Sequence, residues 1–190
     1  MWKNSGPSST DRSLFERIFM KIAVIYASVG GTTRECAELL KKELKIHDVE
    51  LFDLSERDPD LSKYDTIVIG FPIRMGKAMK KARNYMKTHL EDLRKSRVAY
   101  YICCGFVDCF DEYAEKTIPD VLYERAVAIS CLGGSLEPSR FKGLDKLVVK
   151  AVRAEILGGG ENGEQRKDMS LPTIMDENIS QFADKIRCVQ

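Results

Sequence analysis

The sequence predicts an α/β protein with a doubly wound, five-stranded parallel sheet and helices on both faces. Five short apolar runs punctuate the chain, and amphipathic stretches separate most of them. Most of the runs are continuous rather than alternating, which is typical of strands that are covered on both faces, as in a parallel sheet. Strand and helix patterns in alternation favour a doubly wound fold. The runs are Lys21–Ala27, Val49–Phe52, Thr66–Gly70, Val98–Cys104 and Ala126–Cys131.

Three segments have apolar residues at helical spacing. The first follows the first run and presents Thr33, Cys36, Ala37, Leu40 and Leu44 along one face. The second spans about 77–93 and presents Ala78, Ala82, Tyr85, Met86 and Leu90. The third closes the chain with Ile179, Phe182, Ala183 and Ile186. We expect these segments to be the helices that cover the sheet.

Composition narrows the class of protein. The chain has 190 residues, which is enough for one domain with a real core, and its formal net charge is +1. That charge gives no global field favouring nucleic acid as a partner. No run approaches the roughly 18 consecutive apolar residues of a membrane-spanning helix. The six cysteines include no Cys-x-x-Cys pair, which favours a reduced, cytoplasmic protein.

Residues 1–19 differ in composition from the rest of the chain. Residues 1–10 are polar and rich in serine, and they contain the only tryptophan, Trp2. They lack the apolar segment of a secretion signal. We expect 1–19 to be an extension that is disordered or was added to the natural chain, Met20 to be the natural start, and 20–190 to form the single domain.

The loop after the first run has the composition of a phosphate-binding loop. It reads Ser28-Val29-Gly30-Gly31-Thr32-Thr33 and leads directly into the first helix. Glycines allow close backbone approach, hydroxyls donate to phosphate oxygens, and the N–H groups of a helix start favour an anion. Neither the dinucleotide Gly-x-Gly-x-x-Gly pattern nor the Gly-Lys-Ser/Thr ending of a P-loop is present. The alternative is a simple turn with an N-cap threonine.

Two loops together resemble the flavodoxin family. The segment 26–33 resembles the FMN-phosphate signature Thr/Ser-x-Thr-Gly-x-Thr, with Gly30 where the pattern usually has a threonine. The segment Gly70-Phe71-Pro72-Ile73-Arg74-Met75-Gly76 resembles the Gly-x-x-Ile-Arg-x-Gly loop of the flavodoxin-domain branch that contains menaquinone-dependent protoporphyrinogen oxidase. This resemblance implies FMN as the cofactor, bound at the carboxyl ends of the strands.

The resemblance also implies which residues surround the flavin ring. Pro72, Ile73, Arg74, Met75 and Gly76 would line one side of it. Arg74 would favour an anionic reduced flavin; the alternative is a surface arginine in a salt bridge.

The fourth run ends in a loop that is expected to contribute Cys104, Gly105 and Phe106 to the ring site. Gly105 would permit close approach, and Phe106 would stack on the ring or serve as core or lid. The cysteines are expected to be buried and free rather than catalytic or metal-bound. His47 and His89 both lie in segments that look solvent-facing, so no metal site is expected.

The segment 133–175 is longer than a strand-to-helix connection requires. Its apolar residues at helical spacing are Phe141, Leu144, Leu147, Val148, Ala151 and Val152. Lys142, Lys146 and Lys150 form a basic row. Such a helix either packs on the core with its lysines in solvent or lies on a membrane surface or an anionic partner. The stretch 158–165 is predicted to be a mobile loop rather than a nucleotide site.

The pattern therefore predicts an FMN-dependent oxidoreductase that passes electrons from a substrate through FMN to a quinone or a protein acceptor. The chemistry would reside on FMN, without a catalytic side chain. The alternative is a flavodoxin-type electron carrier with no small-molecule substrate of its own. Carriers of that type are usually acidic, which a net charge of +1 does not favour. A third alternative is a flavodoxin fold that has lost FMN.

Overall fold

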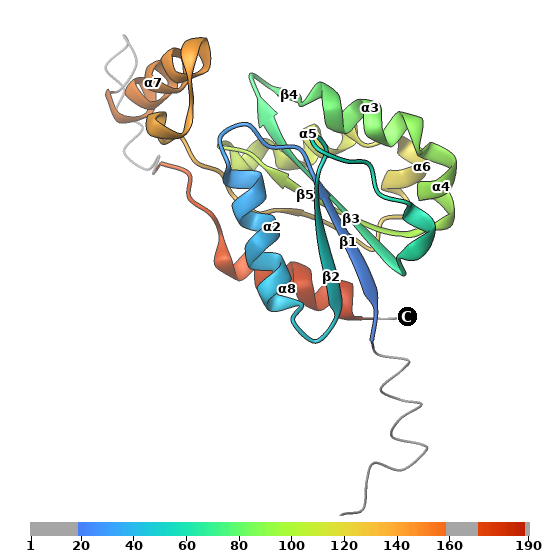
Figure 1. Cartoon of the computed structure of the whole chain (residues 1–190). Helices are drawn as coiled ribbons and strands as arrows, with labels where there is room; N and C mark the ends of the chain where they lie inside the picture. The colour runs from blue at the N-terminus through green and yellow to red at the C-terminus, as the bar shows by residue number, and fades with distance from the viewer. Residues whose placement is uncertain (1–18, 159–170, 189–190) are drawn as a thin grey trace, which may run out of the picture.

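The computed structural model describes residues 19–158 and 171–188, and it forms a parallel sheet between two layers of helices (Figure 1). Five parallel strands lie in the order β2-β1-β3-β5-β6, as predicted for a doubly wound sheet. Their bounds are β1 Lys21–Tyr26, β2 Asp48–Asp53, β3 Thr66–Arg74, β5 Arg97–Cys103 and β6 Ala128–Cys131. The order reverses beside β1, so the loops after β1 and β3 meet at the switch point, where Ala27 N–H donates to the Gly70 carbonyl at 3.0 Å.

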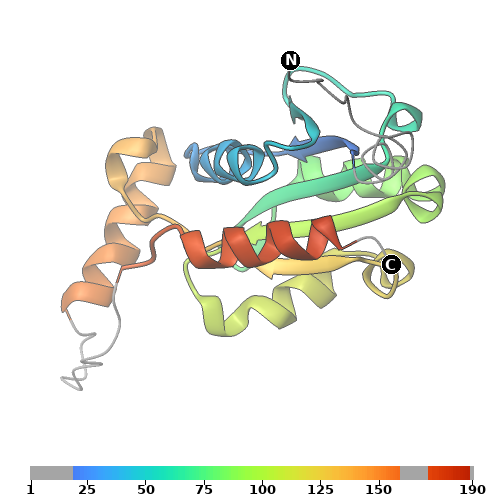
Figure 2. The ribbon, with the colours of Figure 1, turned by 90° about the horizontal axis from the view of Figure 1, so that it is seen from below.

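Helices cover both faces of the sheet (Figures 1 and 2). On one face lie α2 Thr32–Glu43 and α8 Asp176–Arg187. On the other lie α3 Lys80–Thr88, α4 Leu90–Lys95, α5 Phe110–Thr117 and α6 Asp120–Tyr123. The three-residue 3₁₀ helices are η1 Leu61–Lys63, η2 Val107–Cys109 and η3 Pro138–Arg140. The remaining helix, α7 Gly143–Gly158, stands beyond the carboxyl edge of the sheet.

Side chains that alternate along the strands supply two cores. Ile25, Ile69 and Ile102 pack toward α3–α6, whereas Val24, Val68 and Tyr101 pack toward α2 and α8. The predicted faces of the first and last helices are buried as expected, including Cys36, Leu40, Phe182 and Ile186. A sheet covered on both sides explains why the strand sequences are continuously apolar.

The second predicted helix differs from the structure. Lys77 and Ala78 form a sixth, two-residue strand, β4, which pairs antiparallel with the end of β3. The helix that follows is interrupted at His89, which separates α3 from α4. Strand β3 also continues to Arg74 rather than ending at Gly70. The pairing of Ile73 with Ala78 draws this segment into the sheet edge.

Two neighbouring strands fix the start of α2. An added Cβ at Gly70 would lie 1.9 Å from Tyr101 Cζ, so only glycine leaves room for this ring. The Tyr101 hydroxyl donates to the Thr33 backbone carbonyl at 2.9 Å. Because Tyr101 is fully buried, desolvation raises the pKa of its phenol well above the usual 10. The hydroxyl therefore remains a proton donor that anchors the first turn of α2.

The structure does not describe two of the predicted segments, and it corrects the predicted position of one histidine. Residues 1–18 and 159–165, predicted to be an extension and a mobile loop, lie outside the described residues. The prediction that His47 faces solvent is wrong, because its side chain is buried beneath Met20, whose N–H donates to His47 Nδ1 at 3.4 Å. His89 is partly buried and pairs with Asp58 at 2.9 Å. Among the helices of the described ranges, none combines the length and the hydropathy needed to cross a bilayer.

Candidate functional site

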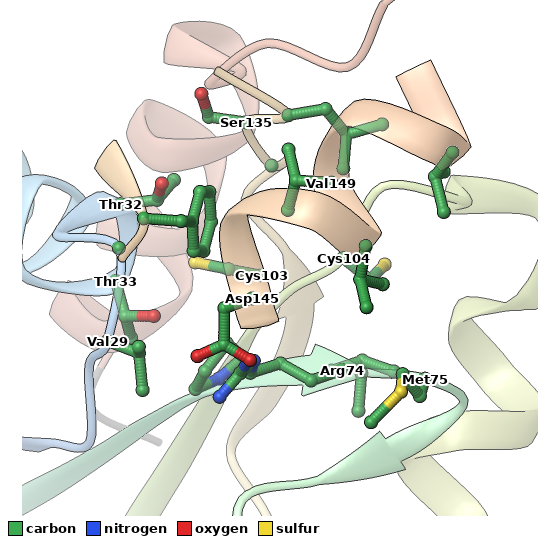
Figure 3. A pocket seen from close by; sticks show the side chains of 18 of the residues that line it. Val29, Thr32, Thr33, Arg74, Met75, Cys103, Cys104, Ser135, Asp145 and Val149 are labelled. Atoms are coloured by element: carbon green, nitrogen blue, oxygen red, sulfur yellow. The ribbon is translucent and has the colours of Figure 1, made fainter. Parts of the chain in front are cut away.

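A cavity opens at the carboxyl edge of the sheet, between the loops after β1, β3 and β5 and the inner face of α7 (Figure 3). All but two of the residues predicted to bind the cofactor line it, and these are Ser28, Val29, Gly30, Thr32, Thr33, Pro72, Ile73, Arg74, Met75, Gly76, Cys104 and Phe106. The exceptions are Gly31 and Gly105. Three loops that are distant in sequence thus share one cavity, as the rule for parallel sheets requires.

The loop after β1 presents unpaired polar groups to the cavity. The Ser28 Oγ is buried and has no hydrogen-bond partner among the described residues. Gly31 adopts φ 83°, a left-handed conformation that favours glycine, and no side chain caps the N-terminus of α2. Thr32 and Thr33 are buried in the first turn. Because a buried hydroxyl without a partner is costly, this arrangement suits a ligand that accepts hydrogen bonds, such as a phosphate.

Gly30 is covered by an aromatic ring from the segment before α7. A Cβ at Gly30 would lie 2.6 Å from Phe141 Cζ and 2.7 Å from its Cε1. The adjacent Arg140 anchors this segment to α2 through an ion pair with Glu35 at 2.6 Å. The absence of a threonine side chain at position 30 is therefore matched by Phe141, which occupies the space.

The loop after β3 is a tight hairpin. Met75 and Gly76 connect the paired residues Arg74 and Lys77, and both have positive φ, 48° and 69°. Two-residue hairpin loops with positive φ at both positions match the twist of the flanking strands. Met75 has a backbone conformation that favours glycine, and the residue is 80% exposed. The hairpin gives the β3 side of the cavity a fixed shape.

Arg74 pairs with a carboxylate from α7. Its guanidinium contacts Asp145, and both side chains are partly buried (Figure 3). This is the salt-bridge alternative that the sequence left open for Arg74, although the residue also lines the cavity. The pair joins the β3 hairpin to α7 across the opening.

The loop after β5 supplies the apolar wall. Cys104 is 2% exposed and Phe106 is 43% exposed at the cavity. Gly105 does not line the cavity, and a Cβ there would lie 3.5 Å from Pro172 and 3.9 Å from Leu136. Its expected approach to the flavin is therefore not visible in this structure.

Several lining residues were not predicted, because they come from the long connections after β5 and β6. These are Tyr113, Gly134, Ser135, Leu136, Phe141, Asp145, Val148, Val149 and Val152, and Cys103 at the end of β5 also lines the cavity. No motif marks them in the sequence. Across residues 19–158 and 171–188, no three His, Cys, Asp or Glu side chains are grouped as a metal site would require.

Comparison with known proteins agrees with this architecture. The family model described as a flavodoxin domain matches residues 23–162. Protoporphyrinogen IX dehydrogenase [quinone] of Escherichia coli (strain K12) is 25% identical over 187 residues, covering 88% of this chain and 94% of the relative.

Among solved structures, the Fusobacterium nucleatum flavodoxin bound to flavin mononucleotide is 13% identical. The match covers 88% of this chain and 97% of that one, with a TM-score of 0.47. The two-electron reduced Megasphaera elsdenii flavodoxin is 19% identical, covering 70% and 99%, with a TM-score of 0.45. On the family match, this chain belongs to the flavodoxin domain family.

Proposed function

We propose that this protein binds FMN in the cavity at the carboxyl edge and acts as an FMN-dependent oxidoreductase. The observation that carries the proposal is the buried, unpartnered Ser28 Oγ beside the uncapped start of α2. This hydroxyl, the first-turn N–H groups and the hydroxyls of Thr32 and Thr33 would hold the phosphate. When bound, FMN supplies two-electron chemistry that no side chain here provides.

The other walls suit a flat, largely apolar ring. Pro72, Ile73, Cys104 and Phe106 present mostly apolar surface, and Tyr113 adds a second aromatic side chain. Arg74 lies at the same cavity, but Asp145 offsets its charge. The stabilisation of an anionic reduced flavin by Arg74 is therefore weaker than for an isolated guanidinium.

We infer that the oxidoreductase passes electrons from a substrate to a quinone or a protein acceptor. The E. coli relative is a quinone-linked protoporphyrinogen IX dehydrogenase, and it aligns over most of both chains. A net charge of +1 gives little support to the alternative of a carrier that docks on basic partners.

Anaerobic flavin reduction tests this proposal. Protoporphyrinogen IX should bleach the flavin absorbance of the FMN-loaded protein, and menadione should restore it over repeated turnovers. If the flavin is reduced only by a flavodoxin reductase and then reoxidised only by a protein acceptor, the protein is the carrier instead. Protein that binds no FMN would contradict both.

We also propose that α7 contacts an anionic membrane surface, where a lipid-soluble quinone would be found. The apolar residues of α7 do not all pack inward: Val148 and Val152 line the cavity, whereas Leu144 is 80% and Leu147 62% exposed. Leu144, Leu147 and Ala151 share one face, while Lys146 and Lys150 lie on the neighbouring face and are also exposed. An exposed apolar stripe flanked by lysines is typical of helices that lie at a membrane interface.

Vesicle sedimentation tests the membrane contact. The protein should sediment with vesicles rich in phosphatidylglycerol and remain in solution with phosphatidylcholine alone. Replacing both Leu144 and Leu147 with Ser should abolish sedimentation without lowering the melting temperature, since neither side chain is buried. Replacing Lys87 and Lys116, which lie on helices of the sheet body, is the matched control. Equal sedimentation by the serine variant would contradict the proposal.

A further inference from the structure

Two cysteine thiols meet at the edge of the proposed flavin site. Cys104 follows the last residue of β5, Cys131 ends β6, and their Sγ atoms are 3.4 Å apart although 27 positions separate them in sequence. Both side chains are nearly buried, at 2% and 5% exposure. Cys104 also lines the cavity (Figure 3). One thiol of the pair therefore borders the space that FMN would fill, and the other lies directly behind it.

The pair is placed so that it can form a bond. A disulfide is about 2.05 Å long, so the two sulfur atoms need to approach by about 1.4 Å. The backbone holds the two strand ends side by side, because Cys131 pairs with Ile102 in the ladder and the Cys104 N–H donates to the Gly133 carbonyl at 2.9 Å. Within the described residues all six cysteines are free thiols.

The electrostatics of the pair favour a thiolate on Cys131. The hydrogen bond with the Cys104 thiol, and then the backbone N–H groups of Gly133 and Cys104, lower the pKa of Cys131 from its usual 9.0. The same interaction and burial raise the pKa of Cys104. A lowered pKa increases the share of Cys131 that is present as thiolate, which is the reactive form of cysteine.

We propose that Cys104 and Cys131 are a redox-active dithiol that exchanges two electrons with the flavin bound in the adjacent cavity. The inference rests on the proposed binding of FMN. On oxidation two S–H bonds break and one S–S bond forms, which releases two electrons and two protons. Oxidised FMN takes up those two electrons and two protons to become FMNH₂, and the reverse reaction regenerates the dithiol.

A second cysteine pair provides an internal control. The Sγ atoms of Cys36 on α2 and Cys103 on β5 are 3.7 Å apart in the core on the other face of the sheet, and Cys103 also lines the cavity. The hydrogen bond to Cys36 and complete burial raise the pKa of Cys103 well above its usual 9.0, so a thiolate is disfavoured there. The two pairs have similar distances between their sulfur atoms, and the lowered pKa of Cys131 favours a thiolate in the pair that contains Cys104.

Reductive titration of the FMN-loaded protein tests the exchange. Dithionite added to the air-oxidised wild type should deliver four electrons per FMN, two to the flavin and two to the disulfide. Cys131→Ser and Cys104→Ser should each accept only two, whereas Cys36→Ser, which removes the second pair without changing a cavity-lining residue, should still accept four. Each variant's flavin absorbance and far-UV circular dichroism show that it is loaded and folded. Two electrons per FMN in the wild type would overturn the proposal.

A measurement on apoprotein separates this proposal from FMN binding. After treatment with oxidised dithiothreitol and alkylation, a tryptic digest should contain peptide 98–116 joined to peptide 126–140. The link should persist in Cys103→Ser and disappear in Cys104→Ser. A protein that binds FMN but never forms this link refutes the dithiol and leaves the proposed function intact. A protein that forms the link but binds no FMN refutes both electron exchange with flavin and the proposed function.

Discussion

At the scale of single residues, the departure of this loop from the flavodoxin signature has a physical reason. Gly30 replaces a threonine because the Phe141 ring lies where a side chain would be. The sequence shows the missing hydroxyl but cannot show its cause, since Phe141 is more than a hundred positions away. The Ser28 hydroxyl is the reverse case. Its position was predictable from the motif, whereas its lack of a partner required the structure.

The pair of Gly30 and Phe141 predicts a coupled effect. Gly30→Thr alone should destabilise the fold by about 1–3 kcal/mol through overpacking and should weaken FMN binding. Adding Phe141→Ala should recover part of the affinity, because the new hydroxyl then has room to reach the phosphate. Urea denaturation and FMN titration of both single variants and the double variant give the coupling energy. Additive effects would contradict the steric explanation.

Removal of the Ser28 hydroxyl should affect the ligand more than the fold. A hydrogen bond to a charged group contributes about 1.5–3 kcal/mol, so Ser28→Ala should raise the Kd for FMN at least about tenfold. The melting temperature of apoprotein should not fall, since the hydroxyl has no partner to lose. Ser62→Ala, at η1 and away from the cavity, is the control. An unchanged Kd would remove Ser28 from the phosphate site.

At the scale of secondary-structure elements, the strands were predictable and the connections less so. Apolar runs identified all five parallel strands, and most of these runs are continuous because burial on both faces removes polar residues from them. The segment 77–93 was wrongly predicted as a single helix, because Ala78 fits a helical apolar stripe although it is buried on β4. Helix α5 gave a weak signal, since only Ala114 of its residues is buried. Pairing with β3 places Lys77 and Ala78 in a strand, and no local pattern in the sequence indicates this pairing.

The link between β5 and α2 can be tested with two neighbouring tyrosines. Tyr101→Phe removes the hydrogen bond to the Thr33 carbonyl and should cost about 1 kcal/mol of the free energy of unfolding, with weaker FMN binding. Tyr100→Phe is the matched control, because its buried hydroxyl has no partner and its loss should cost nothing. Chemical denaturation of both variants provides the comparison. Equal destabilisation would mean that the hydroxyl bond does not hold the loop.

At the scale of the whole molecule, the site is predictable as far as the parallel sheet dictates it. Loops that follow β1, β3 and β5 must meet at one edge, so their residues converge on one cavity. The residues contributed by α5 and α7 could not be anticipated, since nothing in the sequence sets where a long connection folds back. His47 was misplaced for the same reason: a histidine among charged neighbours looks exposed until the chain packs over it.

Burial of His47 predicts a pH dependence of the global stability. Desolvation, and then the charges of Arg187 and Arg97, lower its pKa below 6.5. The unfolded chain therefore binds a proton near pH 6.5 where the folded protein does not, and the free energy of unfolding should fall as the pH decreases through that window. The free energy of unfolding levels off below the pKa that His47 has in the folded protein. Urea denaturation between pH 7.5 and about 5.5 should show this slope in the wild type and a smaller one in His47→Asn; identical slopes would contradict it.

The most direct test of this account is equilibrium binding of FMN to refolded apoprotein, followed by flavin fluorescence and isothermal calorimetry. We predict one FMN per chain with a Kd in the micromolar range or tighter, and much weaker binding of riboflavin, which lacks the phosphate. Folded protein that binds no FMN, or that binds riboflavin equally well, would contradict the assignment of the loop at residues 28–33 to the phosphate.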